Sequence, residues 1–313
     1  MYSIVVPVYK NEDSICDLLQ VLQRISNQLT GSLEVVFVVD GSPDQSFQRL
    51  TAALPNVSFA SKVIVLSRNF GSFAAIRVGL QKATGSYFAV MAADLQEPPE
   101  LMIDFFDALA KNEADVVVGT RIARQDPLLG RIASQSFWLL YRKLIQSATP
   151  KGGIDVFGCN DLFRRSLLEL DESHSSLVGL VLWLGFRRKL VPYQRQKRVY
   201  GRSSWTISKR VRYLLDSAFS FSQTPIQALF WMGLIGCIAS VVLSMIVVWA
   251  RLSGGIQVPG YSPVILTITF FGSLNLICMA ILGSYVWRAF ENTKQRPGAI
   301  VMKELSFTPA IQR

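Results

Sequence analysis

Histidine is almost absent from this chain of 313 residues: His174, in the polar segment DESHSS, is the only one. A site that uses histidine as a general base or as a metal ligand is therefore not expected. Cysteine is scarce too, with four residues and no C-x-x-C pair, which indicates neither a zinc site nor a disulfide framework and fits a reducing cytoplasm. The chain also lacks the G-x-G-x-x-G and P-loop patterns, so the fingerprints of dinucleotide and ATP sites are missing.

Charged residues make up only 17% of the chain, and two long stretches, residues 227–250 and 258–287, contain none. Each exceeds the roughly 20 residues that cross a bilayer, which predicts two C-terminal transmembrane helices. Ten basic residues from Arg187 to Arg212 precede them and five follow, whereas the link between them carries only Arg251. The positive-inside rule therefore places the N-terminal domain and the C-terminus in the cytoplasm and the short link outside.

The chain begins directly in a strand pattern, SIVVPVY, so we expect no signal peptide. Valine- and isoleucine-rich runs then alternate with helical patterns over roughly the first 120 residues, which predicts a doubly wound α/β domain with a mostly parallel, buried sheet. The expected strands are residues 3–9, 34–40, 62–67, 87–93 and 115–119. The expected helices are residues 14–26, 45–54, 73–82 and 99–112.

Polar side chains lie at or just after the ends of several expected strands: Tyr9, Asp40, Asp94 and Arg121. The carboxyl ends of parallel strands meet at one edge of the sheet, so these residues are expected to converge there. The alternative is that every parallel strand ends in something polar, which explains two carboxylates and an arginine less well.

The segment VMAADLQEPPE, residues 90–100, is the most informative stretch. Asp94 and Gln96 are two residues apart on a tight loop, so both side-chain oxygens can face one hard cation that also binds phosphate. The pair Pro98-Pro99 then starts a helix, because proline suits the first helical turn. The alternative is an Asp N-cap on an ordinary crossover helix.

A third membrane-related segment precedes the two uncharged stretches. Residues 205–221 read as an amphipathic helix, with Ile207 and Val211 on one face and Lys209 and Arg212 on another. Such a helix suits the membrane interface, where the basic residues attract anionic headgroups. The alternative is a helix packed on the soluble domain.

Five motifs in order, VPVYKNE, VVDGSPDQS, SRNFGSFAAIRVGL, DLQEPPE and GTR, precede a basic GRSSWT segment and two apolar stretches. Over nearly the whole chain this pattern resembles the family 2 polyisoprenyl-phosphate glycosyltransferases, especially the bacterial bactoprenol-phosphate glucosyltransferases. The resemblance implies a Rossmann-like GT-A fold. The expected organisation is a glycosyltransferase domain (1–203), an interface helix region (204–224), a transmembrane hairpin (225–290) and a cytoplasmic tail (291–313).

The resemblance also implies site residues. It assigns the nucleotide sugar to Pro7, Tyr9, Glu12, Asp40, Asp94 and Gln96. It assigns a divalent metal, Mg²⁺ or Mn²⁺, to Asp94 and Gln96. It assigns phosphate and the acceptor to Arg121, Arg131, Ser134, Arg198 and Arg202. Asp155, with Asp94, is assigned to catalysis as a group that orients the acceptor and only secondarily as a base. Three positions depart from the family pattern: Asn11, Val39 and Ala92 stand where acidic residues are usual.

The implied reaction is an inverting transfer of a hexose, with glucose from UDP-glucose as first choice, to undecaprenyl phosphate at the cytoplasmic face of a bacterial-type inner membrane. A lipid phosphate with a last pKa near ~6 is mostly dianionic at neutral pH, so it needs no strong base. Two alternatives stay open: another nucleotide sugar, or a catalytically weak scaffold that binds nucleotide sugars for a membrane partner. A membrane-anchored nucleotidyl or sugar-phosphate transferase and a transporter fit the motifs less well. No nucleic-acid partner is expected, and a homo-oligomer is plausible.

Overall fold

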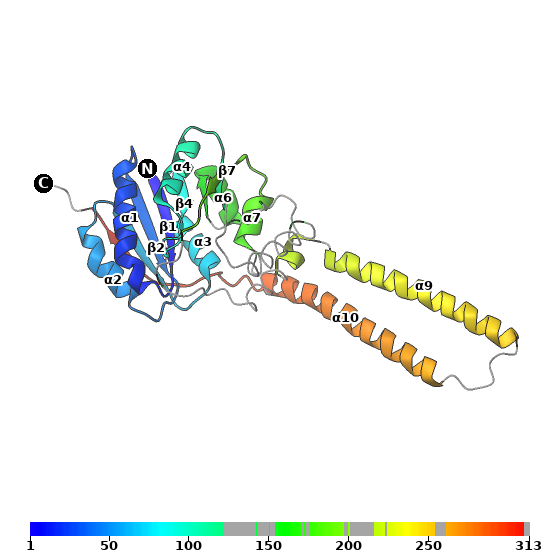
Figure 1. Ribbon diagram of the computed structural model, residues 1–313. Helices are drawn as coiled ribbons and strands as arrows, with labels where there is room; N and C mark the ends of the chain where they lie inside the picture. Colours follow the sequence, from blue (N-terminus) through cyan, green and yellow to red (C-terminus); the bar gives the residue numbers. More distant parts are fainter. Residues whose placement is uncertain are drawn as a thin grey trace.

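The computed structural model describes residues 1–121, 156–170, 176–196, 216–222, 224–253 and 261–309, together with residues 142, 150, 154, 172 and 200. Within these residues an α/β domain carries two long helices that extend from one side of it (Figure 1). The predicted fold class of the N-terminal domain is therefore confirmed.

The centre of the domain is one sheet of eight strands in the order β7-β5-β6-β4-β1-β2-β3-β8. The strands are β1 (Tyr2–Val8), β2 (Leu33–Val39), β3 (Ala60–Leu66), β4 (Tyr87–Val90), β5 (Val116–Arg121), β6 (Phe157–Asn160), β7 (Arg188–Tyr193) and β8 (Val301–Phe307). β6 is antiparallel to both β4 and β5, and β8 is antiparallel to β3; the other pairs are parallel. The sheet is therefore mixed, with six of the eight strands running in one direction.

Helices cover both faces of this sheet. The helices are α1 (Ile15–Gln28), α2 (Ser46–Ala53), α3 (Ser72–Lys82), α4 (Pro99–Ala110), α6 (Asp161–Glu169) and α7 (Leu177–Trp183), with 3₁₀ turns at Glu12–Ser14 and Leu54–Asn56. One core cluster takes Ile4 and Val6 from β1 together with side chains of α1, α2 and α4. The other takes Val5 together with side chains of α3, α6 and α7. Successive side chains of β1 thus enter opposite cores, which is why the strand is an unbroken apolar run.

Pro7 lies inside the central strand β1, where a proline would ordinarily interrupt a ladder. The Val5 carbonyl accepts from Met91, next to β4, and the Val8 carbonyl accepts from Asp40, next to β2. Backbone groups alternate between the two sides, so the nitrogen of Pro7 faces the β4 side. The β1–β4 pairing ends at Val5 and Val90. Proline therefore costs no ladder hydrogen bond at this position.

The two long helices are α9 (Thr224–Leu252) and α10 (Tyr261–Thr293). Among the described residues, Phe270–Thr293 is long and apolar enough to cross a membrane, and Thr224–Gly236 is a shorter apolar helix. Large apolar side chains on both helices are exposed, including Ile235, Trp249 and Leu276. One expected span is thus supported by length and composition, and the second stays a prediction.

The described end of the amphipathic segment packs against protein. Residues 216–221 are helical, and Asp216 forms an ion pair with Arg288 of α10, 2.7 Å between Oδ1 and the guanidinium. Phe221 lies so close to α7 that a Cβ on Gly179 would be 2.3 Å from its ring. The helical segment just before α9 and the end of α10 are therefore held together beside the domain.

Candidate active site

The loops after β1 and β2 are joined by a short run of hydrogen bonds. The backbone amides of residues 10–12 donate in turn to the side chains of Ser42, Ser46 and Asp44, at 2.7, 3.2 and 3.0 Å. Lys10 has a φ of 56°, an uncommon conformation for a residue with a side chain. These contacts fix the turn that carries Tyr9.

Asp44 organises this pair of loops. Its carboxylate accepts from the Ser42 and Ser46 hydroxyls at 2.6 and 2.8 Å and from the Ser46 amide at 3.2 Å. Burial acts to raise the pKa of Asp44, but these bonds and the one from the Glu12 amide outweigh it and hold the pKa below its ordinary value. Sequence reasoning did not select Asp44, although an aspartate two residues before a serine is an Asx-turn signal.

Glu12, assigned to the nucleotide sugar by resemblance, has a structural contact. Its Oε2 accepts from the Gln45 amide at 2.9 Å, one residue before α2 begins. The carboxylate thereby satisfies a backbone donor at the start of that helix. A role of Glu12 in binding the nucleotide sugar stays a prediction.

Asp40 is buried at the end of β2, with 2% of its surface exposed. Its two carboxylate oxygens accept from the amides of Phe70 and Gly71, at 2.7 and 2.8 Å. Burial raises the pKa of this carboxyl, and the two amides and the charge of Arg68 only partly offset that effect. Asp40 therefore holds the β3–α3 loop, and its expected role in binding the nucleotide sugar stays a prediction.

Gly41 permits the same loop to approach closely. Its φ is 55°, and a Cβ built on it would lie 2.3 Å from the backbone carbon of Arg68. Glycine therefore meets two requirements at this position, a left-handed backbone and the absence of a side chain. The glycine of the VVDGS motif thus allows the loop after β2 to lie directly against the loop after β3.

Tyr9 stands at the end of β1 with 38% of its surface exposed. The Lys10 Nζ lies 5.6 Å from the centre of its ring. An exposed aromatic ring beside the Asp40 and Asp44 loops offers a face on which a nucleobase can stack.

The loop that follows β4 carries Asp94 and Gln96. The Ser14 hydroxyl donates to the Ala93 carbonyl at 2.9 Å, which ties this loop to the start of α1. Leu95 has a φ of 56°, which is unfavourable for a bulky residue and holds the chain in a sharp turn between Asp94 and Gln96. The side chain of Leu95 packs against the core, and this packing fixes the turn on the domain.

The segment after β7 lies directly on this turn. The Arg195 guanidinium donates to Oε1 of Gln96, the Gln196 amide donates to the Gln96 carbonyl at 2.9 Å, and the Gln96 side chain donates to the Gln196 carbonyl at 3.3 Å. The Arg195 Nε–H is buried without a hydrogen-bond partner in the part of the chain that the structure describes. Arg195 therefore places a cation beside Gln96 with donor capacity to spare. Sequence reasoning did not assign it a site role, because β7 was not expected.

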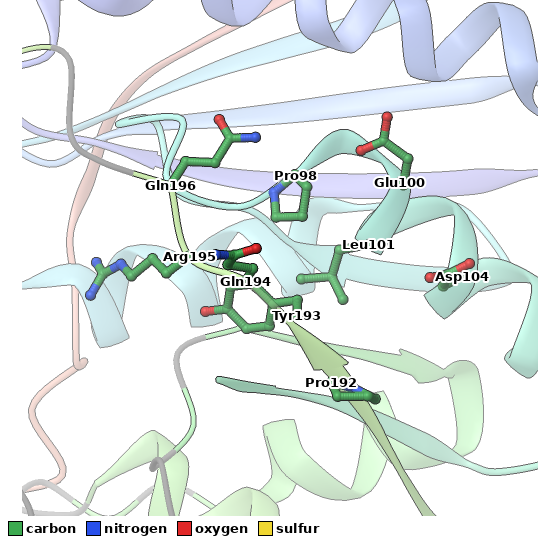
Figure 2. Close-up of a pocket in the computed structure, with 9 residues that line it drawn as sticks. All are labelled: Pro98, Glu100, Leu101, Asp104, Pro192, Tyr193, Gln194, Arg195 and Gln196. Atoms are coloured by element: carbon green, nitrogen blue, oxygen red, sulfur yellow. The ribbon is translucent and has the colours of Figure 1, made fainter. Parts of the chain in front are cut away.

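A groove of about 520 Å³ lies between this segment and the start of α4. Figure 2 shows Arg195 extending to one side of it, with Glu100 and Asp104 of α4 on the other side. The two ends of the groove therefore carry opposite charges.

The topology brings the candidate residues to one edge of the sheet. β6 is antiparallel to both β4 and β5, so β5 runs in the same direction as β4, β1 and β2. Arg121 ends β5 and lies opposite Tyr193, two residues before Arg195. Tyr9, Asp40, Asp94 and Arg121 thus share the carboxyl edge, as the strand pattern predicts. Five other assigned residues lie outside the described part of the chain: Arg131, Ser134, Asp155, Arg198 and Arg202.

The metal assignment can be compared with the donor set. No group of three or more His, Cys, Asp or Glu side chains able to hold a metal occurs among the described residues. Asp94 and Gln96 supply one carboxylate and one amide oxygen, which fits a Mg²⁺-type site completed by substrate phosphate and water. The Gln96 oxygen already accepts from Arg195, and its second lone pair is the one it could offer to a cation.

Comparison with known proteins gives consistent matches. Residues 3–170 match the model of glycosyl transferase family 2. An undecaprenyl-phosphate 4-deoxy-4-formamido-L-arabinose transferase of Serratia proteamaculans is 29% identical over 98% of this chain and 94% of its own. A prophage bactoprenol glucosyl transferase homolog of Escherichia coli is 27% identical over 96% of this chain and 98% of its own. The crystal structure of S. aureus TarS 1-349 aligns with 62% of this chain and 59% of its own, at 21% identity and a TM-score of 0.43.

Proposed function

Because this chain belongs to glycosyl transferase family 2, and is therefore a glycosyltransferase, we propose that it moves a hexose from a UDP-sugar to a polyisoprenyl phosphate. UDP-glucose and undecaprenyl phosphate are the first candidates. The observation that carries the proposal is the meeting, at one sheet edge, of the Tyr9–Asp40 loops with the Asp94–Gln96 turn. The names of the two bacterial relatives support a polyprenyl phosphate as acceptor.

The proposed reaction is a single displacement with inversion at the anomeric carbon. A lipid phosphate oxygen forms a bond to that carbon while the bond to the donor diphosphate breaks and its electron pair leaves with the diphosphate. The acceptor is already dianionic near neutral pH, so no proton has to be removed. The assigned role of Asp155 is to orient this acceptor.

The main electrostatic task is to bring two phosphate groups together and to stabilise the one that leaves. Arg121 and Arg195 come from neighbouring strands at the same edge, and guanidinium groups bind phosphate in a bidentate manner. Asp94 and Gln96 would hold a divalent cation, which supplies charge neutralisation for the departing diphosphate when bound. On donor binding, Arg195 is expected to exchange Gln96 for a phosphate oxygen.

The attachment of the helices supports a membrane location. The Asp216–Arg288 ion pair holds the helical segment 216–221, just before α9, beside the end of α10, and β8, after α10, joins the sheet of the catalytic domain. Both ends of the helix pair thus lie beside the domain. A chain that crosses a bilayer through α9 would therefore return through α10. With the basic residues of the sequence, this geometry supports two spans and a cytoplasmic catalytic domain.

The test is transfer of labelled sugar from a panel of UDP- and GDP-sugars into an organic-extractable lipid, with undecaprenyl phosphate as acceptor. Asp94→Ala is expected to reduce turnover at least about 100-fold, the scale seen when one preorganised electrostatic group is removed. Asp107→Ala, at an exposed acid of α4, is the matched control. Binding of UDP-sugar without transfer by the unmodified protein would favour the scaffold alternative, and full turnover in Asp94→Ala would refute the site.

A further inference from the structure

The C-terminal strand β8 does more than end the chain, because it reaches a loop of the candidate donor site. We propose that residues 299–307 are a positioning element that holds the β3–α3 loop in its donor-binding conformation and links it to the membrane helices. The inference rests on the proposed function for the identity of the donor, a nucleoside diphosphate sugar. The contacts that carry it lie within the described residues.

The first step is the attachment of β8 to the sheet. It pairs with β3 along its whole length, from Ser61 opposite Phe307 to Leu66 opposite Val301. Glu304 forms an ion pair with Lys82 of α3 at 2.7 Å, and the Lys303 Nζ lies 5.1 Å from the centre of the Phe47 ring. Figure 1 shows the chain returning from α10 across the domain to this strand.

The second step is the contact beyond the end of β3. The Ser67 amide donates to the Ile300 carbonyl at 2.9 Å, so pairing continues past a register shift at Val65 and Leu66 into the loop. Ala299 packs against the same core cluster as Phe70 and Phe73. The C-terminal segment therefore holds the first residue of the β3–α3 loop directly.

The third step leads from this loop to the site. Three residues after Ser67, the amides of Phe70 and Gly71 donate to the buried carboxylate of Asp40. The same loop passes over Gly41 too closely for any side chain. A loop released at Ser67 would loosen both contacts, and these contacts form one wall of the predicted nucleoside site beside Tyr9.

The fourth step is the connection to the membrane. Only residues 294–300 separate the end of α10 from β8. A shift of α10 relative to the domain is therefore transmitted to the loop that Asp40 holds. A simpler alternative is that β8 only covers an exposed strand edge, in which case the loop would not respond to its loss.

The experiment compares the full chain with truncations that end at residue 298 or at residue 309. The shorter chain lacks β8, and the longer one keeps it and serves as the control. The first readout is hydrogen exchange at the Phe70 and Gly71 amides; the second is the KM for UDP-sugar against kcat and the KM for lipid phosphate. A peptide of residues 298–309, added in trans, tests for rescue.

Loss of β8 is expected to speed exchange at both amides and to raise the donor KM about tenfold, with kcat and the lipid KM within twofold. The peptide should restore both values. If the truncated chain does not fold, Leu305→Asp in the full chain, which places a charge on a side chain packed against the core, gives the same readouts. Unchanged exchange at Phe70 and Gly71 would overturn the inference. Faster exchange in a protein that transfers no sugar would instead refute the proposed function alone.

Discussion

Replacement of Glu34 by alanine is expected to destabilise the catalytic domain strongly. Glu34, the second residue of β2, is 4% exposed and lies opposite Ser3 of β1. Its carboxylate accepts from the Ser3 hydroxyl at 2.7 Å, from the amide and hydroxyl of Thr84 at 2.8 and 3.0 Å, and pairs with the Lys62 ammonium at 2.9 Å. Alanine would remove this acceptor from all four donors, of which Lys62 keeps its hydrogen bond to the Lys82 carbonyl at 2.9 Å.

The size of the effect follows from burial. Removal of one partner of a buried ion pair costs about 3–5 kcal/mol. The Lys62 side chain is 21% exposed, so water can reach it and the lower end, about 3 kcal/mol, is expected. For a domain of 150–250 residues each kcal/mol shifts Tm by about 2–4 °C, which gives a decrease of roughly 6–12 °C.

Thermal unfolding of the purified full chain, followed by circular dichroism, measures this decrease. Arg165→Ala is the control, because its ion pair with Asp161 is 70% exposed on the arginine side and such helix pairs contribute about 0.3–0.5 kcal/mol. Equal Tm values for the two variants would refute the buried network as a source of stability.

The same residue predicts a pH dependence. Burial acts to raise the pKa of Glu34, but hydrogen bonds from Thr84, Lys62 and Ser3 outweigh it and hold the pKa below its ordinary value of 4.5. A carboxyl with a lowered folded pKa stabilises the fold above the unfolded pKa, and this contribution is lost as the pH falls through the folded pKa. The Tm difference between wild type and Glu34→Ala should therefore be full at pH 6 and shrink below about pH 4.5.

Three further perturbations test other contacts. Gly41→Ala should lower the free energy of unfolding by at least about 2 kcal/mol and weaken UDP binding, because the left-handed backbone alone costs alanine about 1–2 kcal/mol and its Cβ meets the β3–α3 loop; normal UDP binding by calorimetry would contradict this. Asp115→Asn should flatten the loss of stability in acid, since the Arg187 guanidinium holds the pKa of Asp115 below its ordinary value; an unchanged acid limb of Tm against pH would count against the pair. Gly179→Ala should cost about 1–3 kcal/mol by overpacking against the Phe221 ring, and simple additivity with Phe221→Leu in a double-mutant cycle would show that the two do not couple.

The first part of the fold, from β1 to β5, was readable from the sequence. The first five strands and four helices lie within a few residues of the predicted ranges, because buried parallel strands are continuous apolar runs and the crossover helices begin after polar loops. β4 ends earlier than expected, at Val90, since the chain leaves β1 to form the Asp94 turn.

The remaining strands were not predicted, for two physical reasons. β6 has only four residues, too few for a periodic signal, and its antiparallel place depends on both neighbours. β8 exposes most of its residues and contains Lys303 and Glu304, so its sequence resembles a solvated tail until β3 is placed beside it. It lies in the region expected as a separate tail, yet it extends the sheet of the N-terminal domain.

The sequence indicated candidate site residues that share one short segment. It did not indicate residues that tertiary contacts bring to the site from elsewhere in the chain. The Asp94–Gln96 turn was recognised from its own residues. Arg195 reaches Gln96 across 99 positions of sequence, and nothing near Arg195 in the chain indicates that contact. The hydrogen bonds from the Phe70 and Gly71 amides to Asp40 also join residues that are far apart in the sequence.

The position of β8 also has a consequence for biosynthesis. Lys82 and Glu304, which join in the folded protein, are separated by 222 positions that include both long apolar helices. A ribosome therefore releases the outermost strand of the sheet only after both long helices have been made. Until β8 is made, the edge of β3 stays unpaired and open to pairing with other chains, so completion of the catalytic sheet is a late event in the synthesis of this chain.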